Sequence, residues 1–322
     1  MKAIVRDRYG SADVLELRDV DQPAIGPREV LVRVRAAGVD RGVWHVMTGL
    51  PYLGRLAFGL RAPRNAVIGM DVSGVVEEVG AEVAALRAGD EVFGSCNGAF
   101  AEFAAVREDR CALKPTGLTL EQAAALPTSA VTALQALRKQ GRVQAGQRVL
   151  VIGAGGGVGS YAVQIAKALG AHVTGVCSTS KVALVRSLGA DEVIDYTVTD
   201  VAEAGERYDL VLDIAGNRPV HRLRRLLVPR GTLVFVGGEQ GGRLTGGMGR
   251  QLGAALLSVV VRQRMRSFVA VTRRPDLETL REMVESGAVR PALDRTYPLA
   301  DAPQAIRDLE EGRVRGKAVV TV

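Results

Sequence analysis

The chain has 322 residues, of which 47% are hydrophobic and 24% charged, and its 42 Lys and Arg against 35 Asp and Glu leave a formal net charge of +7. These values exclude a disordered chain and a fibrous repeat, and the length is sufficient for two domains. Aromatic residues make up only 4% of the chain, fewer than a protein that stacks single-stranded nucleic acid on aromatic side chains would need.

The cysteines and the apolar runs predict a protein of the cytoplasm. Cys96, Cys111 and Cys177 lie far apart, which argues against a disulfide framework and suits a reducing compartment. The N-terminus carries charges throughout, and the longest apolar run, residues 254–261, is too short to cross a bilayer. Because the basic residues are scattered along the chain, we expect neither a nucleic-acid partner nor a membrane partner.

The first third of the chain contains short strand signals separated by Gly and Pro. Val30, Val32 and Val34 recur with a period of two, which predicts a half-buried strand. Four further stretches share such strand signals: residues 2–6, 14–18, 67–79 and 100–106. Short strands with frequent turns predict a small antiparallel barrel or sandwich. The long connection over residues 48–65 is typical of a functional loop.

The middle of the chain changes to an alternation of strands and helices. Thr119 and Gln122 form a capping box that predicts a helix start, and helical periodicity ends at Gly141. From Arg148 onward, continuous apolar strands alternate with helices. This alternation is typical of an α/β fold, with a doubly wound parallel sheet covered on both faces. The C-terminal segment repeats a helix–strand–helix–strand order.

A glycine-rich loop follows the first of these apolar strands and precedes a helix. The order strand, loop, helix is the context in which such a loop binds a dinucleotide. Gly156 would let the backbone approach a pyrophosphate, and Gly159 would let the helix pack on the strand. The predicted cofactor-binding positions in the loop are Ala154, Gly156, Gly157, Val158 and Gly159. The alternative is a helix N-terminus that binds no ligand.

The end of the second strand indicates which dinucleotide binds. A loop for NAD would have Asp or Glu about 20 residues further on, to accept from the ribose 2′-hydroxyl, but no acid appears before Asp191. Ser178, Thr179 and Lys181 occupy this position and are suited to a 2′-phosphate. We therefore expect NADPH as the cofactor, with an ordinary turn and a solvated lysine as the alternative.

Several motifs together resemble the medium-chain dehydrogenase/reductase superfamily, most closely its zinc-free NADPH:quinone oxidoreductase branch. They include AAGVDRG, VIGMDVSGVVEEVG, AALPTSAVTALQAL, GAGGGVG, RSLGADEVIDY and RGKAVVTV. The resemblance implies a GroES-like antiparallel β-barrel catalytic domain at residues 1–122 and 268–322. It also implies a Rossmann domain at residues 123–267, an active site between the domains, and a homodimer through the Rossmann sheets.

The resemblance also implies further cofactor contacts. Thr132 would touch the nicotinamide or only pack within its helix, and Lys317 would lie near the cofactor or belong to a solvated terminus. Tyr196 and Gly237 complete the predicted cofactor site.

Departures from the zinc-dependent relatives argue against a metal. Those relatives have Cys near Asp40, His and Glu at Met70 and Asp71, and Cys near Thr128. Of Asp40, Met70 and Thr128, only the aspartate is a plausible zinc ligand, so we predict no metal site. Without a Lewis acid to ionise an alcohol, we expect reduction of a quinone or an activated enone, because NADPH itself carries the hydride.

Asp40, Trp44 and Tyr52 are the predicted catalytic residues. Trp44 would stack on a planar acceptor or serve as a core aromatic, and Tyr52 would donate to the developing oxygen anion. His45 is expected to be structural. The leading hypothesis is an NADPH-dependent quinone reductase. The alternatives are an enone or enoyl reductase, an NADPH-binding redox sensor without turnover, and a basic nucleic-acid binder.

Overall fold

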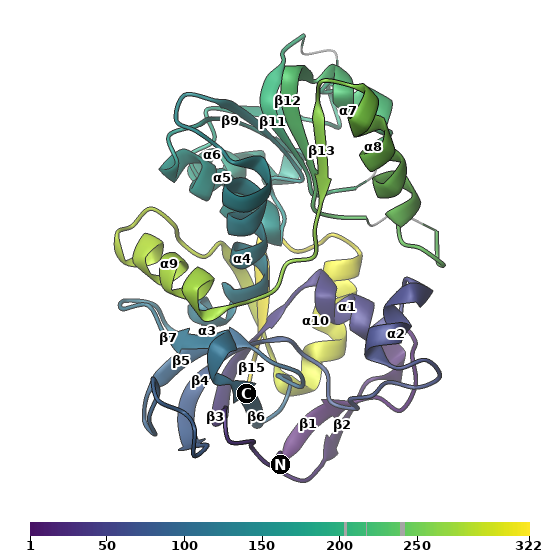
Figure 1. Cartoon of the computed structure of the whole chain (residues 1–322). Helices are drawn as coiled ribbons and strands as arrows, with labels where there is room; N and C mark the ends of the chain where they lie inside the picture. Colours follow the sequence, from purple (N-terminus) through teal and green to yellow (C-terminus); the bar gives the residue numbers. More distant parts are fainter. Residues whose placement is uncertain (203–204, 217, 239–241) are drawn as a thin grey trace. The chain divides into compact units, whose positions relative to one another are not determined.

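The chain folds into two compact units. The computed structural model describes residues 1–202, 205–216, 218–238 and 242–322 (Figure 1). Residues Met1–Val131, Val271–Gly287 and Pro291–Val322 form the first unit, called here the barrel unit. Thr132–Ala270 and Ala288–Arg290 form the second, called here the nucleotide unit.

The barrel unit is built on a largely antiparallel sheet with the strand order β14-β15-β3-β4-β5-β7, in which β6 also pairs with β3, and on the separate pair β1-β2. Only β14 and β15 run parallel. Its strands are β1 (Lys2–Val5), β2 (Glu16–Asp19), β3 (Glu29–Val39), β4 (Asp71–Val79), β5 (Glu91–Ser95), β6 (Phe103–Arg107), β7 (Cys111–Leu113), β14 (Leu293–Pro298) and β15 (Lys317–Thr321).

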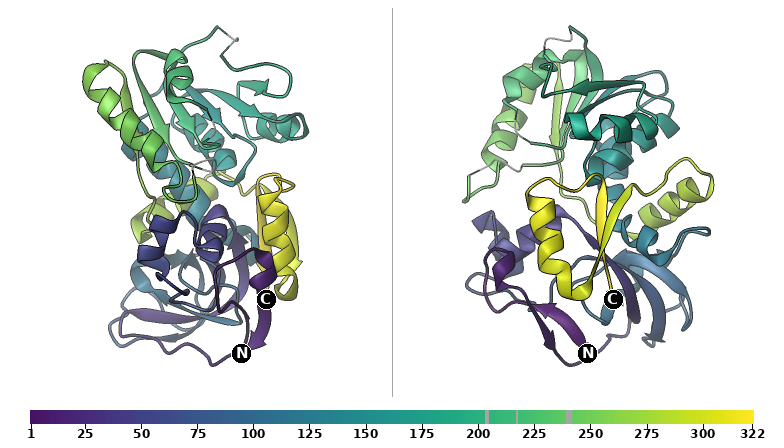
Figure 2. Two further views of the ribbon diagram at one scale, coloured as in Figure 1. Left: turned by 90° about the vertical axis from the view of Figure 1, so that its right-hand side faces the viewer. Right: turned by 180° about the vertical axis from the view of Figure 1, so that it is seen from behind.

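The helices of the barrel unit pack around this sheet, over a buried core that includes Val32, Val72 and Phe100. They are α1 (Arg41–Thr48), α2 (Arg55–Phe58), α3 (Leu120–Ala124), α9 (Arg274–Glu285) and α10 (Ala302–Glu310), with α4 (Pro127–Gln135) at the boundary of the unit. Figure 2 shows α10 lying along β14 and β15. The closing segment of the chain thus completes the fold begun by the N-terminal third.

The boundary after α3 differs from the one predicted at residue 122. The capping box of Thr119 and Gln122 forms as expected and begins α3. This helix packs on β3, β4 and β5, because its alanines, among them Ala124, are buried against Ala36 and Val319. The helical stretch predicted for the second domain therefore begins within the first.

In its described residues, the nucleotide unit contains a six-stranded, parallel sheet with the order β10-β9-β8-β11-β12-β13. This order reverses between β8 and β11, which is where doubly wound sheets bind their ligands. The elements are β8 (Arg148–Ile152), α5 (Gly157–Ala168), β9 (His172–Cys177), α6 (Val182–Ser187), β10 (Glu192–Asp195), β11 (Tyr208–Asp213), α7 (Val220–Arg225), β12 (Leu227–Phe235), α8 (Met248–Val260) and β13 (Arg264–Ser267).

Helices cover both faces of this parallel sheet. Figure 1 shows α5 and α6 on one face and α7 and α8 on the other. The central strands β8, β11 and β12 are largely apolar, with Leu150, Val211 and Leu233 all buried, because they are covered on both sides. The predicted fold class, a GroES-like barrel with a doubly wound parallel sheet, is confirmed. No described helix has the length and hydropathy needed to cross a bilayer.

Candidate functional site

The glycine-rich loop connects β8 to α5 at the point where the strand order reverses. Gly153 has a φ of 93°, a conformation that favours glycine. A Cβ at Gly159 would lie 2.1 Å from the Gly153 carbonyl oxygen, whereas one at Gly156 would meet only that same oxygen, at 3.5 Å. The backbone at Gly156 is therefore open to a ligand, while Gly159 is where the helix packs directly on the loop.

The N-terminus of α5 is suited to an anion. Gly156 is its N-cap and has no capping side chain, and Ser160 makes the first backbone bond of the helix, to Gly156. The amides of Gly157 and Val158 have no hydrogen-bond partner in the described parts of the chain. Free amides and the helix dipole together favour a phosphate at this position. The structure thus brings the predicted loop residues together at one edge of the sheet.

Lys181 lies directly against this loop. A Cβ at Gly155 would come within 2.7 Å of the Lys181 Cβ and 2.8 Å of its Cδ. Ser178 continues β9 in extended conformation, and Thr179–Lys181 form a single 3₁₀ turn before α6. The hydroxyls and the lysine predicted to bind a 2′-phosphate are therefore placed at the end of β9, beside the predicted pyrophosphate loop.

Asp195 is a neighbouring residue that the sequence analysis did not identify. It ends β10, which pairs in parallel with β9 so that Asp195 lies opposite Cys177. Its carboxylate accepts hydrogen bonds from the backbone N–H of Thr197 at 2.9 Å and from its hydroxyl at 2.7 Å. Hydrogen bonding by Thr179 and Thr197 keeps the pKa of Asp195 below its usual range. A carboxylate therefore does lie near the predicted ribose position, but it comes from the adjacent strand.

The remaining predicted cofactor residues of the nucleotide unit lie at different strand ends or on α4. Tyr196 is half exposed, and its amide donates to Cys177 at the end of β9. Gly237 follows β12, and a Cβ there would come 2.1 Å from the Ile214 carbonyl oxygen. Thr132 is a partly buried residue of α4.

Lys317 lies in the barrel unit and is almost completely buried, with 1% of its surface exposed. Its Nζ donates to the Val39 carbonyl at 3.2 Å and lies 3.8 Å from the Asp71 carboxylate. The alternative that it belongs to a solvated terminus is therefore wrong. A role near the cofactor stays a prediction.

Asp71 is the centre of a buried polar cluster that the sequence analysis did not assign to the site. It begins β4, and none of its surface is exposed. The Thr128 hydroxyl donates to it at 2.5 Å and the Thr128 amide at 3.0 Å. Burial, and then the charge of Asp40, raise the pKa of Asp71 to about 8, against the opposing effects of Lys317 and Thr128.

Asp40 and Trp44 carry buried polar atoms without a partner. Asp40 is the N-cap of α1, where its Oδ1 accepts from the Val43 amide at 3.2 Å. Its Oδ2 and the Trp44 Nε1 are both buried without a hydrogen-bond partner in the described parts of the chain. Buried polar groups are nearly always paired in folded proteins, so this acceptor and this donor make the start of α1 a candidate functional position.

His45 and Tyr52 differ in their surroundings. The His45 Nδ1 lies 2.8 Å from the Leu50 carbonyl, to which it donates, in agreement with a structural role. Tyr52 is 42% exposed in the 3₁₀ turn Tyr52–Gly54, and the Arg55 guanidinium lies over its ring, 4.8 Å from the centroid. The phenol is therefore accessible.

At the positions that hold zinc ligands in zinc-dependent relatives, this chain has Asp40, Met70 and Thr128. A Cβ at Gly42 would meet the Asp40 Oδ1 at 2.8 Å and the Met70 Sδ at 2.9 Å, so these two side chains are neighbours. A thioether and a threonine hydroxyl are not the thiolate, imidazole and carboxylate ligands that zinc selects. Among the described residues, no group of three or more His, Cys, Asp and Glu could hold a metal ion.

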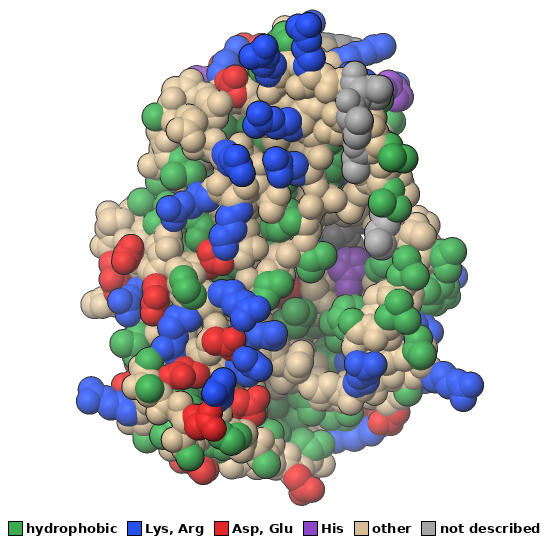
Figure 3. All heavy atoms as spheres, viewed as in Figure 1, with side chains coloured by type: hydrophobic (Ala, Val, Ile, Leu, Met, Phe, Trp, Pro, Cys, Tyr) green, Lys and Arg blue, Asp and Glu red, His purple; other side chains and the backbone are tan. Residues whose placement is uncertain are grey.

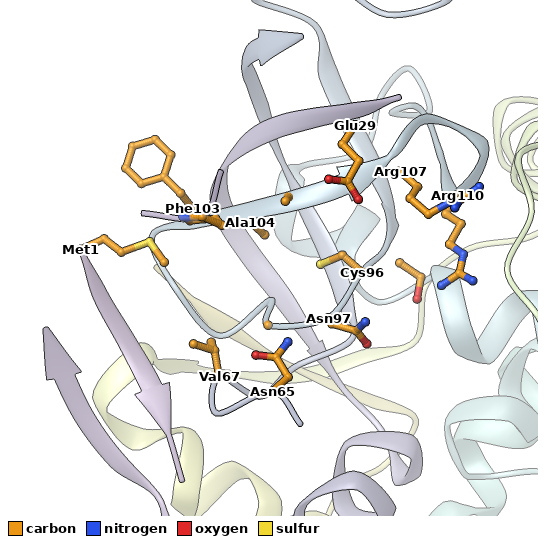
Figure 4. A pocket seen from close by; sticks show the side chains of 14 residues that line it. Met1, Glu29, Asn65, Val67, Cys96, Asn97, Phe103, Ala104, Arg107 and Arg110 are labelled. Carbon is orange, nitrogen blue, oxygen red and sulfur yellow. The ribbon is translucent and has the colours of Figure 1, made fainter. Parts of the chain in front are cut away.

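A cavity of about 300 Å³ with a mixed polar and apolar lining lies elsewhere in the barrel unit (Figure 4). Glu29, Asn65, Asn97 and Arg110 line it, and the Nε of Arg110 is buried without a partner in the described parts of the chain. None of the predicted catalytic or cofactor residues lines this cavity. It therefore belongs to a different part of the barrel.

Comparison with known proteins finds dehydrogenase domains and oxidoreductases as relatives, some of which match the chain over its whole length. An alcohol dehydrogenase GroES-like domain matches residues 26–116, and a zinc-binding dehydrogenase domain matches residues 188–320. The chain is 37% identical to mouse NAD(P)H oxidoreductase RTN4IP1, mitochondrial, covering 100% of this chain and 89% of that protein. It is 33% identical to 2-methylene-furan-3-one reductase of Solanum lycopersicum, covering 99% and 79%. The solved Escherichia coli quinone oxidoreductase complexed with NADPH superposes with a TM-score of 0.85 at 25% identity, covering 100% of each chain.

Proposed function

This chain belongs to the medium-chain dehydrogenase/reductase superfamily of oxidoreductases, and from that membership we propose that it reduces a quinone with NADPH and without a catalytic zinc. The observation that carries the proposal is the packing of Lys181 on the loop at Gly155, beside the amides of α5. A cation held there is suited to the phosphate that distinguishes NADPH from NADH.

The nucleotide unit would hold the cofactor by its backbone and by Lys181. The amides of Gly157 and Val158 would receive the pyrophosphate, and Lys181 with Ser178 would bind the 2′-phosphate. Asp195 lies close by and would favour a ribose hydroxyl, but its carboxylate is already occupied by Thr197. A structural neighbour described as complexed with NADPH supports this assignment.

The barrel unit would supply the acceptor site. NADPH, when bound, supplies the hydride. The indole N–H of Trp44 would donate to a carbonyl oxygen of the acceptor, and the exposed phenol of Tyr52 would provide or relay a proton. A quinone is electrophilic enough to be reduced without a Lewis acid. This agrees with Met70 and Thr128, whose thioether and hydroxyl groups are not typical zinc ligands.

A second candidate function is reduction of the C=C bond of an enone. Two relatives support it by their names, the tomato 2-methylene-furan-3-one reductase and an Arabidopsis NADPH-dependent alkenal/one oxidoreductase that is 33% identical to this chain. The same residues would serve it. An enone, however, needs a proton on carbon as well as a hydride, so it depends more strongly on a proton donor.

The proposal also includes the assembly and the location. We expect a homodimer through the Rossmann sheet, because β13 is an edge strand paired only with β12 in the described structure. A cytoplasmic location stays a prediction, since the mouse relative is named as a mitochondrial protein.

The test is turnover of NADPH with a panel of quinones and enones, measured with and without a strong chelator, together with elemental analysis for zinc. We expect rapid quinone reduction that the chelator leaves unchanged. Preference for enones would support the second function. NADPH binding without turnover of any acceptor would instead support a redox sensor, and salt-dependent binding of random oligonucleotides would support a nucleic-acid binder.

A further inference from the structure

The segment between α1 and β4 exposes an unusual number of large apolar side chains. Leu56 and Leu60 are 64% and 66% exposed, and Tyr52 and Leu53 are each 42% exposed. Leu56 lies on α2, and Leu60 follows Gly59, the C-cap at which this helix ends. Single exposed leucines are common on protein surfaces. Four large apolar side chains exposed within nine residues are unusual and indicate an interaction surface.

The same segment is purely basic in its charged residues. Between Asp40 and Asp71 the chain contains Arg and no Asp or Glu. Arg61 and Arg64 are exposed, and neither guanidinium has a carboxylate partner in the described parts of the chain. Some other exposed arginines of the barrel unit, such as Arg33, are paired with carboxylates. We call Tyr52, Leu53, Leu56, Leu60, Arg61 and Arg64 the α2 surface; Figure 3 shows hydrophobic side chains with basic ones beside them over α2.

We propose that the α2 surface docks on the surface of an anionic lipid bilayer. Leucines next to unpaired arginines are suited to the boundary between headgroups and acyl chains, where the apolar groups insert and the cations stay among the phosphates. Each Arg near an anionic surface strengthens binding about fivefold. The inference differs from the expectation of no membrane partner, which considered only membrane-spanning segments and the spread of charge along the sequence.

This inference rests on the proposed function, because it gives the reductase a route to its acceptor. A quinone with an apolar tail partitions into the bilayer, and Tyr52 belongs both to the α2 surface and to the predicted acceptor residues. Docking by this surface would bring the acceptor residues of α1 and the Tyr52–Gly54 turn next to the lipid phase. Water-soluble quinones would need no such contact.

Other occupants fit this surface less well. A second copy of the chain placed symmetrically on it would bring Arg61 and Arg64 of both copies together, with no acid in the segment to compensate. A nucleic acid would use the arginines but would leave Leu56 and Leu60 without apolar partners. A bilayer is the partner that takes up both groups at once.

The experiment is sedimentation of the full chain with vesicles of phosphatidylcholine, with and without phosphatidylglycerol. We expect binding only to the anionic vesicles, weakening as salt is added. Leu56→Ser/Leu60→Ser and Arg61→Glu/Arg64→Glu should each weaken this binding about tenfold or more. The matched control is Leu252→Ser/Leu256→Ser on α8, a pair with the same spacing and with 63% and 74% exposure, which should bind as the wild type does. Thermal unfolding of each variant confirms that it is folded.

Each outcome bears on the inference. No binding of the wild type, equal binding to vesicles without phosphatidylglycerol, or an equal loss in the α8 variant would overturn it. Turnover separates this failure from that of the proposed function. If water-soluble quinones are reduced and the vesicles are not bound, the inference fails and the function stands. If vesicles are bound but no quinone is reduced, the surface stands and the function fails.

Discussion

The two units of this protein contribute different kinds of groups to the predicted site. In the nucleotide unit, the site is made of backbone: a glycine with positive φ, free amides at the start of α5, and one lysine packed on the loop at Gly155. In the barrel unit, a cluster of buried side chains from distant segments lies beside the predicted site, with Thr128 and Lys317 around the carboxyl of Asp71. A backbone site is sensitive to shape, whereas a site of buried charges is sensitive to protonation, and the two can be perturbed separately.

The largest effect is expected from Gly159→Ala in the nucleotide unit. The added Cβ would lie 2.1 Å from the Gly153 carbonyl oxygen, so the loop or the helix must shift. We expect a loss of about 1–3 kcal/mol in the free energy of unfolding and at least about 100-fold weaker NADPH binding, measured by denaturation and by titration. Gly249→Ala on α8 is the control, because a Cβ there meets nothing within 4 Å. A Gly159→Ala variant with normal NADPH affinity would contradict the assignment of the loop.

Lys181→Ala tests how the nucleotide unit selects its cofactor. A charge-assisted hydrogen bond to a phosphate contributes about 1.5–3 kcal/mol, so we expect the Kd for NADPH to rise about tenfold or more while the Kd for NADH is unchanged. Arg186→Ala removes an exposed cation from the next helix and should leave both constants as they are. Equal affinities of the wild type for the two cofactors would refute the choice of NADPH.

Trp44→Phe tests the barrel unit. The substitution keeps an aromatic ring and removes the buried N–H that has no partner in the described structure. If this N–H donates to the acceptor, kcat/KM should fall about tenfold, the equivalent of one hydrogen bond, with NADPH affinity unchanged. Tyr52→Phe should lower kcat/KM less with quinones than with enones, because an enone needs a proton on carbon. If Trp44→Phe and Tyr52→Phe both keep the kcat/KM of the wild type, the acceptor binds away from these two residues.

Asp71→Asn tests the buried charge cluster through the pH dependence of stability. Burial raises the pKa of Asp71 to about 8 in the folded state, so between the ordinary pKa and this value the folded protein holds a proton that the unfolded chain releases. The free energy of unfolding of the wild type should therefore decrease as pH rises from about 4 to about 8, by about 1 kcal/mol or more in total.

In Asp71→Asn, which mimics the protonated carboxyl, this part of the decrease should disappear. Chemical denaturation at a series of pH values measures it, and Asp21→Asn, at an exposed position, is the control. A decrease of the same size in Asp71→Asn would mean that Asp71 is ionised in the folded protein throughout this range.

The smallest effect is expected from Asp195→Asn. The variant removes a negative charge beside Thr179, near the predicted 2′-phosphate position. We expect NADPH to bind a few-fold more tightly and NADH slightly more weakly, because repulsion of the phosphate is relieved and an acceptor for the ribose hydroxyl is lost. Unchanged affinities for both cofactors would indicate that Asp195 plays no part in selecting the cofactor.

Two features could be identified only from the structure: the position of Asp195 and the unit to which α3 belongs. Asp195 belongs to β10, and only the parallel pairing of β9 and β10 brings it opposite Cys177; the one signal for it in the sequence is that neighbouring parallel strands end at the same edge. The boundary predicted at residue 122 falls within α3, which packs on the barrel sheet, since the sequence cannot show which sheet buries a short alanine-rich helix.

The sequence by itself determined the alternation of strands and helices and the position of the glycine loop. It could do so because a strand, a turn with positive φ and a helix N-terminus are contiguous in the chain and depend on local backbone preferences. Only the tertiary structure decided what surrounds Asp71. The Lys317 side chain reaches Val39 across 278 residues of sequence, through the pairing of β15 with β3. Desolvation and the fields of neighbouring charges depend on such distances and burial, which exist only in the folded chain.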